Sequence, residues 1–211
     1  MPKNTISDTL KNHKIGEVIV LKGWVRTFRS NRFIALNDGS CQSSIQCVVD
    51  FNDFSDEKLR RITTGSSISV SGELVPSLGS GQSVELKVNE IDIIGDCPSE
   101  TYPIQPKRHS LEFLREKANL RMRTSTFSAV MRIRHVAAFA VHDFFNKNGF
   151  FYLNTPIITT SDAEGAGELF RVTTLPFDQT PRNEDGSVNY ELDFFAKPTN
   201  LTVSGQLEGE L

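Results

Sequence analysis

The chain has 211 residues, 38% of them hydrophobic and 23% charged, and a formal net charge of −3. This composition is typical of one large or two small globular domains, and the sequence offers neither a secretory signal nor an apolar run that could cross a membrane. Cys41, Cys47 and Cys97 form no C-x-x-C pair, which argues against a disulfide framework and a thiolate zinc site. We therefore expect a reduced, cytoplasmic protein without a metal site in this chain.

Residues 16–95 have the pattern of a β-rich domain. Short runs of aliphatic and aromatic residues are separated by Gly, Asn and Ser turns, and one charged segment has helical spacing. The predicted strands are 18–28, 32–36, 44–51, 67–74 and 84–94, with a short helix at 55–62. Three strands, a helix and two more strands is the element order of a five-stranded OB-fold β-barrel.

A proline-rich segment at 96–106 then marks a domain boundary. Beyond it, residues 125–148 have apolar side chains at helical spacing and are followed by Gly149, which predicts a long amphipathic helix. Eight basic residues against two acidic ones lie between 101 and 135, either as a local phosphate-binding surface or as a solvated helix face. The predicted divisions are 1–98 for the barrel, 99–124 for a linker or hinge and 125–211 for a second domain.

The second domain begins with further extended segments. Residues 150–159 are predicted as a strand, and Pro156 within it lacks the N–H that a sheet requires, so it suggests an edge or an interface. Residues 169–174 and 201–204 are also extended, while 178–190 resemble an insertion. Because the chain stops at Leu211 just as a helix is predicted to begin, we expect this domain to be incomplete.

Arginine and aromatic residues are interleaved along the first barrel strand and the turn that follows it. Arg26, Arg29 and Phe33 suit single-stranded nucleic acid, because bases stack on aromatic rings and guanidinium groups meet phosphates. The alternative is that Trp24 and Phe28 fill the barrel interior. Phe33 is the better stacking candidate, since it follows an arginine at a strand start.

Two polar clusters in the second domain are candidates for a small-molecule site. The loop at 161–168 is glycine-rich but has no phosphate-binding lysine, and its carboxylates, Glu164 and Glu168, suit a cationic group such as an α-ammonium. Ser204, Gln206 and Glu210 offer a hydroxyl, an amide and a carboxylate, which suit a small zwitterion with an amide tail. The alternatives are an ordinary surface loop and a polar turn.

Seven motifs, in order and across both predicted domains, make the chain resemble the bacterial-type asparaginyl-tRNA synthetases, which are class II enzymes. They are GWVR at 23–26, TTG at 63–65, KRHSLEFLR at 107–115, GFF at 149–151, TPIIT at 155–159, EGAGELF at 164–170 and LTVSGQL at 201–207. The resemblance implies an α+β protein, with an OB-fold barrel that reads the anticodon and the first part of a class II antiparallel-sheet catalytic domain.

The resemblance also implies a reaction and its partners. A homodimer would attach L-asparagine to tRNA(Asn) through asparaginyl-adenylate, using ATP and Mg²⁺ and no membrane. The family's ATP-binding motifs do not occur before Leu211. We therefore expect no catalytic, ATP-binding or metal-binding residue in this chain, and no adenylate formation by the chain alone.

Residue roles follow from the resemblance as well. Phe33 matches the aromatic residue that stacks on an anticodon base, Gln46 matches the residue that hydrogen-bonds the central uridine, and Arg26 and Arg29 fall among the basic residues of the strand. Pro156 belongs to the segment that builds the dimer interface.

The resemblance also implies which residues form the amino-acid site. Glu164 lies in the loop that closes over the amino acid, and Ser204 and Gln206 match residues lining its pocket. Glu210 is the candidate for specificity, because a carboxylate accepts from a side-chain amide and repels a carboxylate. The relatives compared mostly have Asn in place of Glu208 and Gly in place of Ala196.

Three other interpretations account for part of the sequence. An aspartyl-tRNA synthetase would have a lysine in the 204–210 turn, which is absent. A synthetase-like asparagine synthetase would not need the barrel. A free-standing tRNA-binding module would not need the polar residues after position 160.

Overall fold

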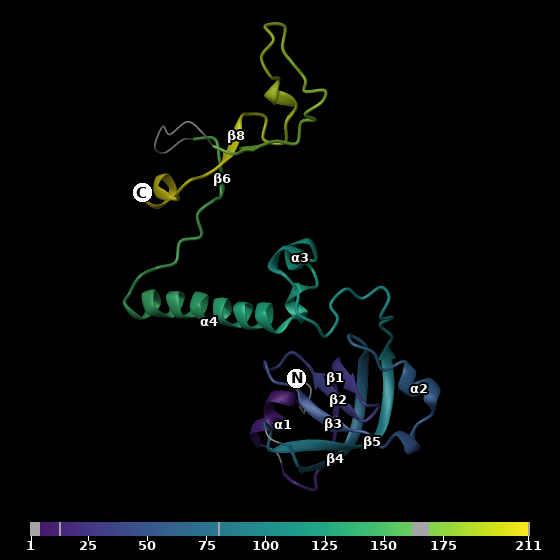
Figure 1. Ribbon diagram of the computed structural model, residues 1–211. Coiled ribbons are helices and arrows are strands. Elements are labelled where there is room, and N and C mark those ends of the chain that lie inside the picture. The colour runs from purple at the N-terminus through teal and green to yellow at the C-terminus, as the bar shows by residue number, and fades with distance from the viewer. Residues whose placement is uncertain (1–4, 13, 80, 162–168, 211) are drawn as a thin grey trace. The chain divides into compact units, whose positions relative to one another are not determined.

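The computed structural model describes residues 5–12, 14–79, 81–161 and 169–210 (Figure 1). It divides into two compact units, Met1–Ala137 and Ala138–Leu211. Within the described residues, no helix is long and apolar enough to cross a membrane. The finer division predicted from the sequence, at residues 98 and 124, stays a prediction.

The first unit is built on a closed five-stranded barrel. Its strands are β1 (Val18–Arg29), β2 (Phe33–Asn37), β3 (Ile45–Val48), β4 (Ser67–Pro76) and β5 (Val84–Gly95). They close in the order β1-β2-β3-β5-β4, with β3 and β5 parallel and the other neighbouring pairs antiparallel. This topology confirms the OB-fold barrel expected from the element order.

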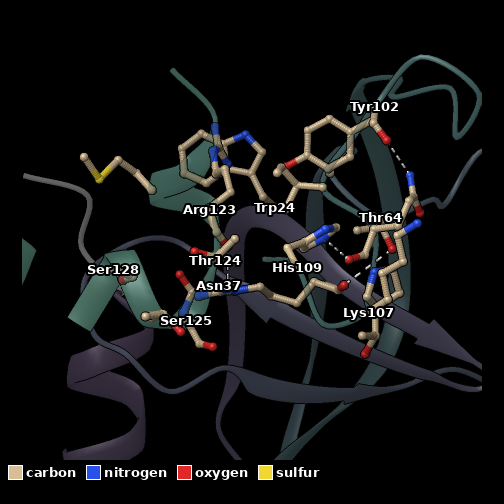
Figure 2. Close-up of a pocket in the computed structure, with 18 of the residues that line it drawn as sticks. Trp24, Asn37, Thr64, Tyr102, Lys107, His109, Arg123, Thr124, Ser125 and Ser128 are labelled. Atoms are coloured by element: carbon tan, nitrogen blue, oxygen red, sulfur yellow. Dashed lines mark hydrogen bonds between the residues drawn. The ribbon is translucent and has the colours of Figure 1, made fainter. Parts of the chain in front are cut away.

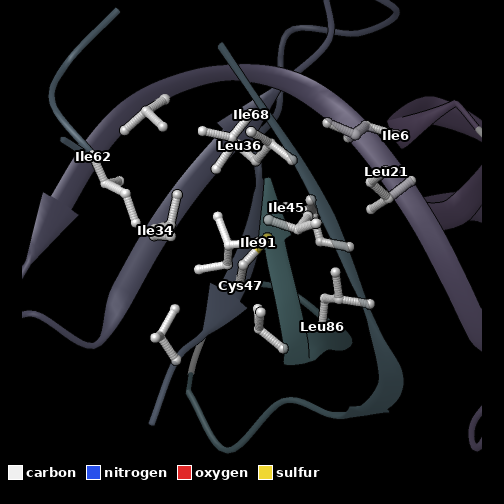
Figure 3. Close-up of a cluster of buried hydrophobic side chains, with 14 of the residues drawn as sticks. Ile6, Leu21, Ile34, Leu36, Ile45, Cys47, Ile62, Ile68, Leu86 and Ile91 are labelled. Atoms are coloured by element: carbon white, nitrogen blue, oxygen red, sulfur yellow. The ribbon is translucent and has the colours of Figure 1, made fainter. Parts of the chain in front are cut away.

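Alternation along the strands fills the barrel interior with aliphatic side chains (Figure 3). On β4, for example, Ile68 and Val70 are fully buried, while the residues between them are partly exposed. Leu21, Ile34 and Leu36 meet them from β1 and β2. Each such side chain contributes about 1.5–3 kcal/mol on burial, so this core fixes the register of the strands that carry the polar sites on the outside.

Helices complete the first unit. Helix α1 (Ile6–Asn12), which the sequence did not predict, inserts Ile6 into the core, and the Ile6 N–H donates to Asp38 at 2.9 Å. Helix α2 (Asp56–Arg60) confirms the predicted short helix and begins at the N-cap Ser55. Helix α3 (Leu111–Glu116) lies in the predicted linker.

One predicted strand is shorter than expected. The segment 44–51 is extended only over β3, and Phe51–Asp53 form a 3₁₀ turn instead. Asp50 accepts a hydrogen bond from the Asn52 N–H, so a side chain takes the donor that a sheet would use. This local competition ends the strand.

Helix α4 (Ser125–Lys147) confirms the predicted long helix, and Gly149 follows it with a φ of +84°. A three-stranded antiparallel sheet lies in the second unit, in the order β6-β8-β7. Its strands are β6 (Ile158–Thr159), β7 (Arg171–Val172) and β8 (Thr199–Leu201), followed by the short helix α5 (Gln206–Gly209). The predicted strand 150–159 is therefore wrong over most of its length: only its last two residues pair.

Asp193 organises the loops beside this small sheet. Its carboxylate accepts hydrogen bonds from the Thr173 hydroxyl at 2.6 Å, from the Thr174 N–H and hydroxyl at 2.9 and 2.7 Å, and from the Phe194 N–H at 2.8 Å. These hydrogen bonds, that from Thr173 first, hold the pKa of Asp193 well below its usual range. The residues directly after β7 are thus tied to the loop that precedes β8.

Candidate nucleic-acid interface

A tight hairpin presents the predicted stacking residue at one end of the barrel. Ser30 and Asn31 have positive φ angles of 53° and 49°, and the Arg32 N–H donates to the Arg29 carbonyl at 3.0 Å. This is the geometry of a type I′ turn, which suits the twist of paired strands. Arg29 and Arg32 are exposed, and Phe33 is half-buried with the Arg32 guanidinium 5.6 Å from its ring centroid.

Next to β2, the predicted residue Gln46 forms one wall of a small pocket of about 260 Å³. The Gln46 amide donates to a carboxylate oxygen of Glu85 at 2.9 Å. The Ser77 hydroxyl donates to the same oxygen at 2.6 Å. Glu85 is only 7% exposed, so its carboxylate is held in a fixed place at the pocket wall.

Nothing in the sequence pattern singles out Glu85. It lies on β5 between two buried aliphatic residues, Val84 and Leu86, and period-2 alternation places such a residue on the outer face, in solvent. In the structure, Gln46, Ser77 and Gln82 cover that face. The sequence does contain an acidic residue on β5, the strand that pairs in parallel with β3, which carries Gln46. This pairing becomes known only with the barrel topology.

This pocket suits the edge of a nucleobase. An amide donor stands beside a carboxylate acceptor, which matches a base edge with a carbonyl next to an N–H, as in uracil. The described lining residues include one carboxylate and no cation. A phosphate would be repelled there, so the pocket suits a base edge better than the backbone.

A second, larger cavity lies on another part of the first unit (Figure 2). It measures about 980 Å³ and is bounded by β1, by the loop at 64–65 and by residues of the segment 102–128. The Arg26 guanidinium donates to the Arg123 carbonyl at 2.7 Å, and the Arg123 guanidinium lies 4.0 Å from the Trp24 ring centroid. Burial lowers the pKa of Arg26, and the nearby Arg123 charge acts in the same direction.

The structure therefore separates the predicted barrel residues. Phe33 and Gln46 lie on β2 and β3, whereas Arg26 lines the larger cavity, which Gln46 does not reach. Trp24 is 40% exposed and does not fill the barrel interior, while Phe28 packs partly against the core. The alternative interpretation, that both rings fill the barrel interior, thus holds in part for Phe28 and is wrong for Trp24.

The wall of the larger cavity is fixed by a close packing of Tyr102 on Gly65. Gly65 has a φ of +94°, and a side chain there would approach the Cys97 sulfur and the Tyr102 ring to within 2.8 and 2.9 Å. Two more side chains connect the barrel to the segment that follows it. Gln42 donates to the Ser125 carbonyl at 2.9 Å, and Arg132 donates to the Gly39 carbonyl. The segment after the barrel is thereby held against it.

The second unit holds the predicted amino-acid residues. The Ser204 hydroxyl donates to the Gln206 side-chain oxygen at 3.3 Å, at the start of α5. Ser204 is half-buried, whereas Gln206, Glu210 and Pro156 are exposed. Glu164 lies outside the described residues. No cluster of three potential metal ligands occurs in the part of the chain that the structure describes.

Gly205 explains the shape of this turn. A side chain at this position would overlap Thr155, so the backbone that follows β8 runs directly against the segment before β6. This close approach sets Ser204 and Gln206 side by side with the residues that precede the sheet. The roles of these residues in binding stay predictions.

Comparison with known families agrees with this geometry. Residues 19–94 match the OB-fold nucleic acid binding domain, and residues 110–183 match the class II tRNA synthetases of the D, K and N group. The two parts of the chain thus have the folds of an OB-fold domain and of the first portion of a class II aminoacyl-tRNA synthetase catalytic domain. Within that class, the chain matches the N-terminal portion of the bacterial-type asparaginyl-tRNA synthetases.

The relatives give the extent of the match. The chain is 55% identical to the asparagine–tRNA ligase of Cytophaga hutchinsonii over 100% of its own length and 47% of the relative. It is also 55% identical to that of Parabacteroides distasonis, over 99% of the chain and 45% of the relative. The chain thus spans about half the length of the curated relatives it matches.

Solved structures confirm the fold. The asparaginyl-tRNA synthetase of Pyrococcus horikoshii, complexed with asparaginyl-adenylate, matches with a TM-score of 0.75 at 24% identity, over 99% of this chain and 44% of that one. A putative aspartyl-tRNA synthetase from Leishmania major matches with a TM-score of 0.69 at 17% identity, over 97% and 39%. At these identities the likeness supports the fold alone.

Proposed function

We propose that the protein catalyses the ATP-dependent attachment of L-asparagine to tRNA(Asn) through asparaginyl-adenylate. The observation that carries this proposal is the 55% identity, over the full chain, to an asparagine–tRNA ligase. The pocket of Gln46 and Glu85 adds a physical reason, because it suits a base edge. The chain contributes RNA recognition and part of the amino-acid site.

The barrel reads the anticodon in this proposal. Phe33 stacks on one base, which stabilises the complex by about 1–3 kcal/mol, and the neighbouring Arg29 meets the phosphates. Gln46 and Glu85 together read the central uridine: the amide donates to a carbonyl of the base, and the carboxylate accepts from its N–H. Arg26 acts from the larger cavity and not from this base-reading surface.

The residues around α5 contribute to asparagine binding. Ser204 and Gln206 line the pocket, and Glu164 closes over the α-ammonium group. Glu210 accepts from the substrate amide and would repel the carboxylate of aspartate. Leaving such a polar group badly paired discriminates by roughly 10⁴–10⁵. The adjoining sheet and the contact of Gly205 with Thr155 support this assignment by fixing the turn.

ATP, Mg²⁺ and a second copy of the protein complete the proposal. Transfer at the α-phosphate depends on positioning and on neutralisation of developing charge, which Mg²⁺ supplies when bound. Pro156 lies in an exposed extended segment that we assign to the homodimer interface. Free cysteines, of which Cys47 is fully buried, agree with a cytoplasmic location.

The test uses the protein expressed from its complete gene. Asparagine should drive ATP–pyrophosphate exchange and should charge tRNA(Asn), whereas aspartate should do neither at comparable concentration. Equal charging of aspartate would contradict the assignment of Glu210 and the proposed substrate. Binding of tRNA without exchange by either amino acid would show a binding module and not a ligase.

A further inference from the structure

The larger cavity of the first unit is strongly basic, although the chain as a whole is acidic. Its described lining residues include no carboxylate, and they include Arg26, Lys107, Arg108 and Arg123 together with His109. Net charge is −3 over the chain, so this local excess of cations is not a consequence of composition. Cations gathered in a concave, carboxylate-free surface attract anions.

The two cavities of this unit are chemically opposite. The small pocket contains the Glu85 carboxylate, and its described lining includes no cation. The larger cavity contains cations and no carboxylate among its described residues. In protein–RNA complexes, base edges are recognised by matched donors and acceptors, and phosphates by cations. The opposite charges of the two cavities therefore predict that one RNA places a base in the small pocket and phosphates in the larger cavity.

We propose that the cavity between β1 and the segment 102–128 binds the sugar–phosphate backbone of the RNA whose bases the barrel reads. This inference rests on the proposed function, because it adds a second contact to the same RNA. Lys107 and Arg108, both exposed at the cavity, are the principal phosphate contacts. Arg26 and Arg123 supply the fixed positive charge behind them.

The geometry favours an extended backbone over a small anion. A volume of about 980 Å³ is at the upper end of the range for small-ligand sites. The cations come from a barrel strand and from two parts of the following segment, which suits several phosphates in a row. Threonine, serine and asparagine residues in the same lining offer further hydrogen-bond partners, as the view in Figure 2 shows.

The cavity also lies away from the stacking residue. Trp24 pairs with Asn37 in the β1–β2 ladder, whereas Phe33 pairs with Arg29 at the other end. The Trp24 end of the cavity lies five residue steps from Arg29, roughly 17 Å along the strand, whereas Thr27 at the near end is two steps from Arg29. Phosphates held at the Trp24 end therefore belong to a different stretch of the RNA from the base that stacks on Phe33.

The cavity is prepared before any ligand binds. Arg26 makes one side-chain hydrogen bond among the described residues, to the Arg123 carbonyl, and a guanidinium carries five N–H donors. Stacking of Arg123 on Trp24 and packing of Tyr102 on Gly65 hold the two walls. A bound phosphate would offset the like charges of Arg26 and Arg123, which no carboxylate in the described lining offsets.

The experiment measures tRNA binding by the protein from its complete gene over a range of salt concentrations. The test variant is Lys107→Gln/Arg108→Gln, and the matched control is Lys22→Gln/Lys87→Gln, which removes two exposed barrel cations that line neither cavity. Each lost phosphate contact should reduce the slope of log K against log salt by roughly 0.7–0.9. If the curves converge near 1 M salt, the test variant should bind roughly 25- to 60-fold more weakly at about 0.1 M salt.

The same measurements are repeated with tRNA changed at the middle anticodon base. The test variant should lose affinity for both tRNAs by the same factor, because phosphate contacts do not read sequence. An unchanged affinity and salt slope, in a variant that still discriminates the anticodon, would overturn this inference and leave the proposed function intact. Loss of discrimination in the test variant, or an equal loss in the control, would also overturn it. Absence of tRNA binding by the unmodified protein would instead refute the proposed function.

Discussion

Replacement of Glu85 by glutamine should reduce recognition of the middle anticodon base. The substitution keeps the length of the side chain, but it replaces a charged acceptor with an amide. In the structure, one carboxylate oxygen receives hydrogen bonds from Gln46 at 2.9 Å and from Ser77 at 2.6 Å. With glutamine at 85, an N–H₂ group can face the base N–H, where an acceptor is required.

The expected magnitude follows from an unpaired donor beside a buried side chain. Glu85 is 7% exposed, so water does not readily replace the lost partner. A buried donor without an acceptor costs about 1–3 kcal/mol. This corresponds to roughly a 5- to 150-fold loss of affinity. The loss should be confined to tRNA with uridine at the middle position, because the pocket contacts no other base in this proposal.

The assay compares dissociation constants for tRNA(Asn) and for a transcript with a changed middle base. Glu90→Gln makes the same chemical change at an exposed position of the same strand and serves as the control. Thermal unfolding checks that both variants fold. If Glu85→Gln is folded and discriminates the two transcripts as well as the unmodified protein does, the assignment of this pocket to the base is wrong.

Three further changes test other parts of the structure. Phe33→Ala should weaken tRNA binding by about 1–3 kcal/mol in a binding assay, because a stacking surface is lost. Gly72→Ala should destabilise the barrel by about 1–3 kcal/mol in urea unfolding, since the added methyl group overlaps the Lys87 backbone. Asp193→Asn should lower the free energy of unfolding at neutral pH, and the difference from the unmodified protein should shrink below about pH 4. The pKa of Asp193 is lower in the folded state than in the unfolded state. The stability that its carboxylate contributes is therefore present above the unfolded-state pKa and is lost as the pH falls.

Matched substitutions separate these effects from general damage. Phe51→Ala removes another exposed aromatic ring of the first unit and should leave tRNA affinity unchanged. Gly79→Ala should change stability by less than about 0.5 kcal/mol, because the nearest atom lies 3.8 Å from the added methyl group. Asp178→Asn, at an exposed position, should leave the pH dependence as it is. If a control variant changes the measured property as much as the matching test variant does, the physical reason given for that test variant is wrong.

The barrel was predictable because its physical signal is local. Alternation such as Ile68–Ser69–Val70 fixes which residues face the core. The turn at 37–40 is marked by Asn37 and Asp38, whose side chains accept hydrogen bonds from backbone N–H groups two residues later. The long helix was predictable for the same reason, since its apolar spacing and Gly149 lie within one segment. Phe33 could be selected from its neighbours in the sequence.

Features that depend on distant partners were not predictable. Helix α1 forms where Asp38 and Ser40 accept its N–H groups, more than thirty residues away. The segment 150–159 has strand-like composition, but Phe151 is 93% exposed and Pro156 has no N–H, so most of it finds no strand partner in the described residues. Glu85 became a candidate only when the barrel placed it against Gln46.

Three side-chain hydrogen bonds between the barrel and residues 123–132 end on peptide carbonyls. Arg26 donates to Arg123, Gln42 to Ser125 and Arg132 to Gly39. Since every amino acid carries such an oxygen, exchanging Ser125 for another residue leaves its acceptor in place, whereas exchanging Gln42 removes the bond. Over evolution, the residues that donate these hydrogen bonds should therefore be conserved. A residue that contributes only its carbonyl, such as Ser125, should accept substitutions more freely.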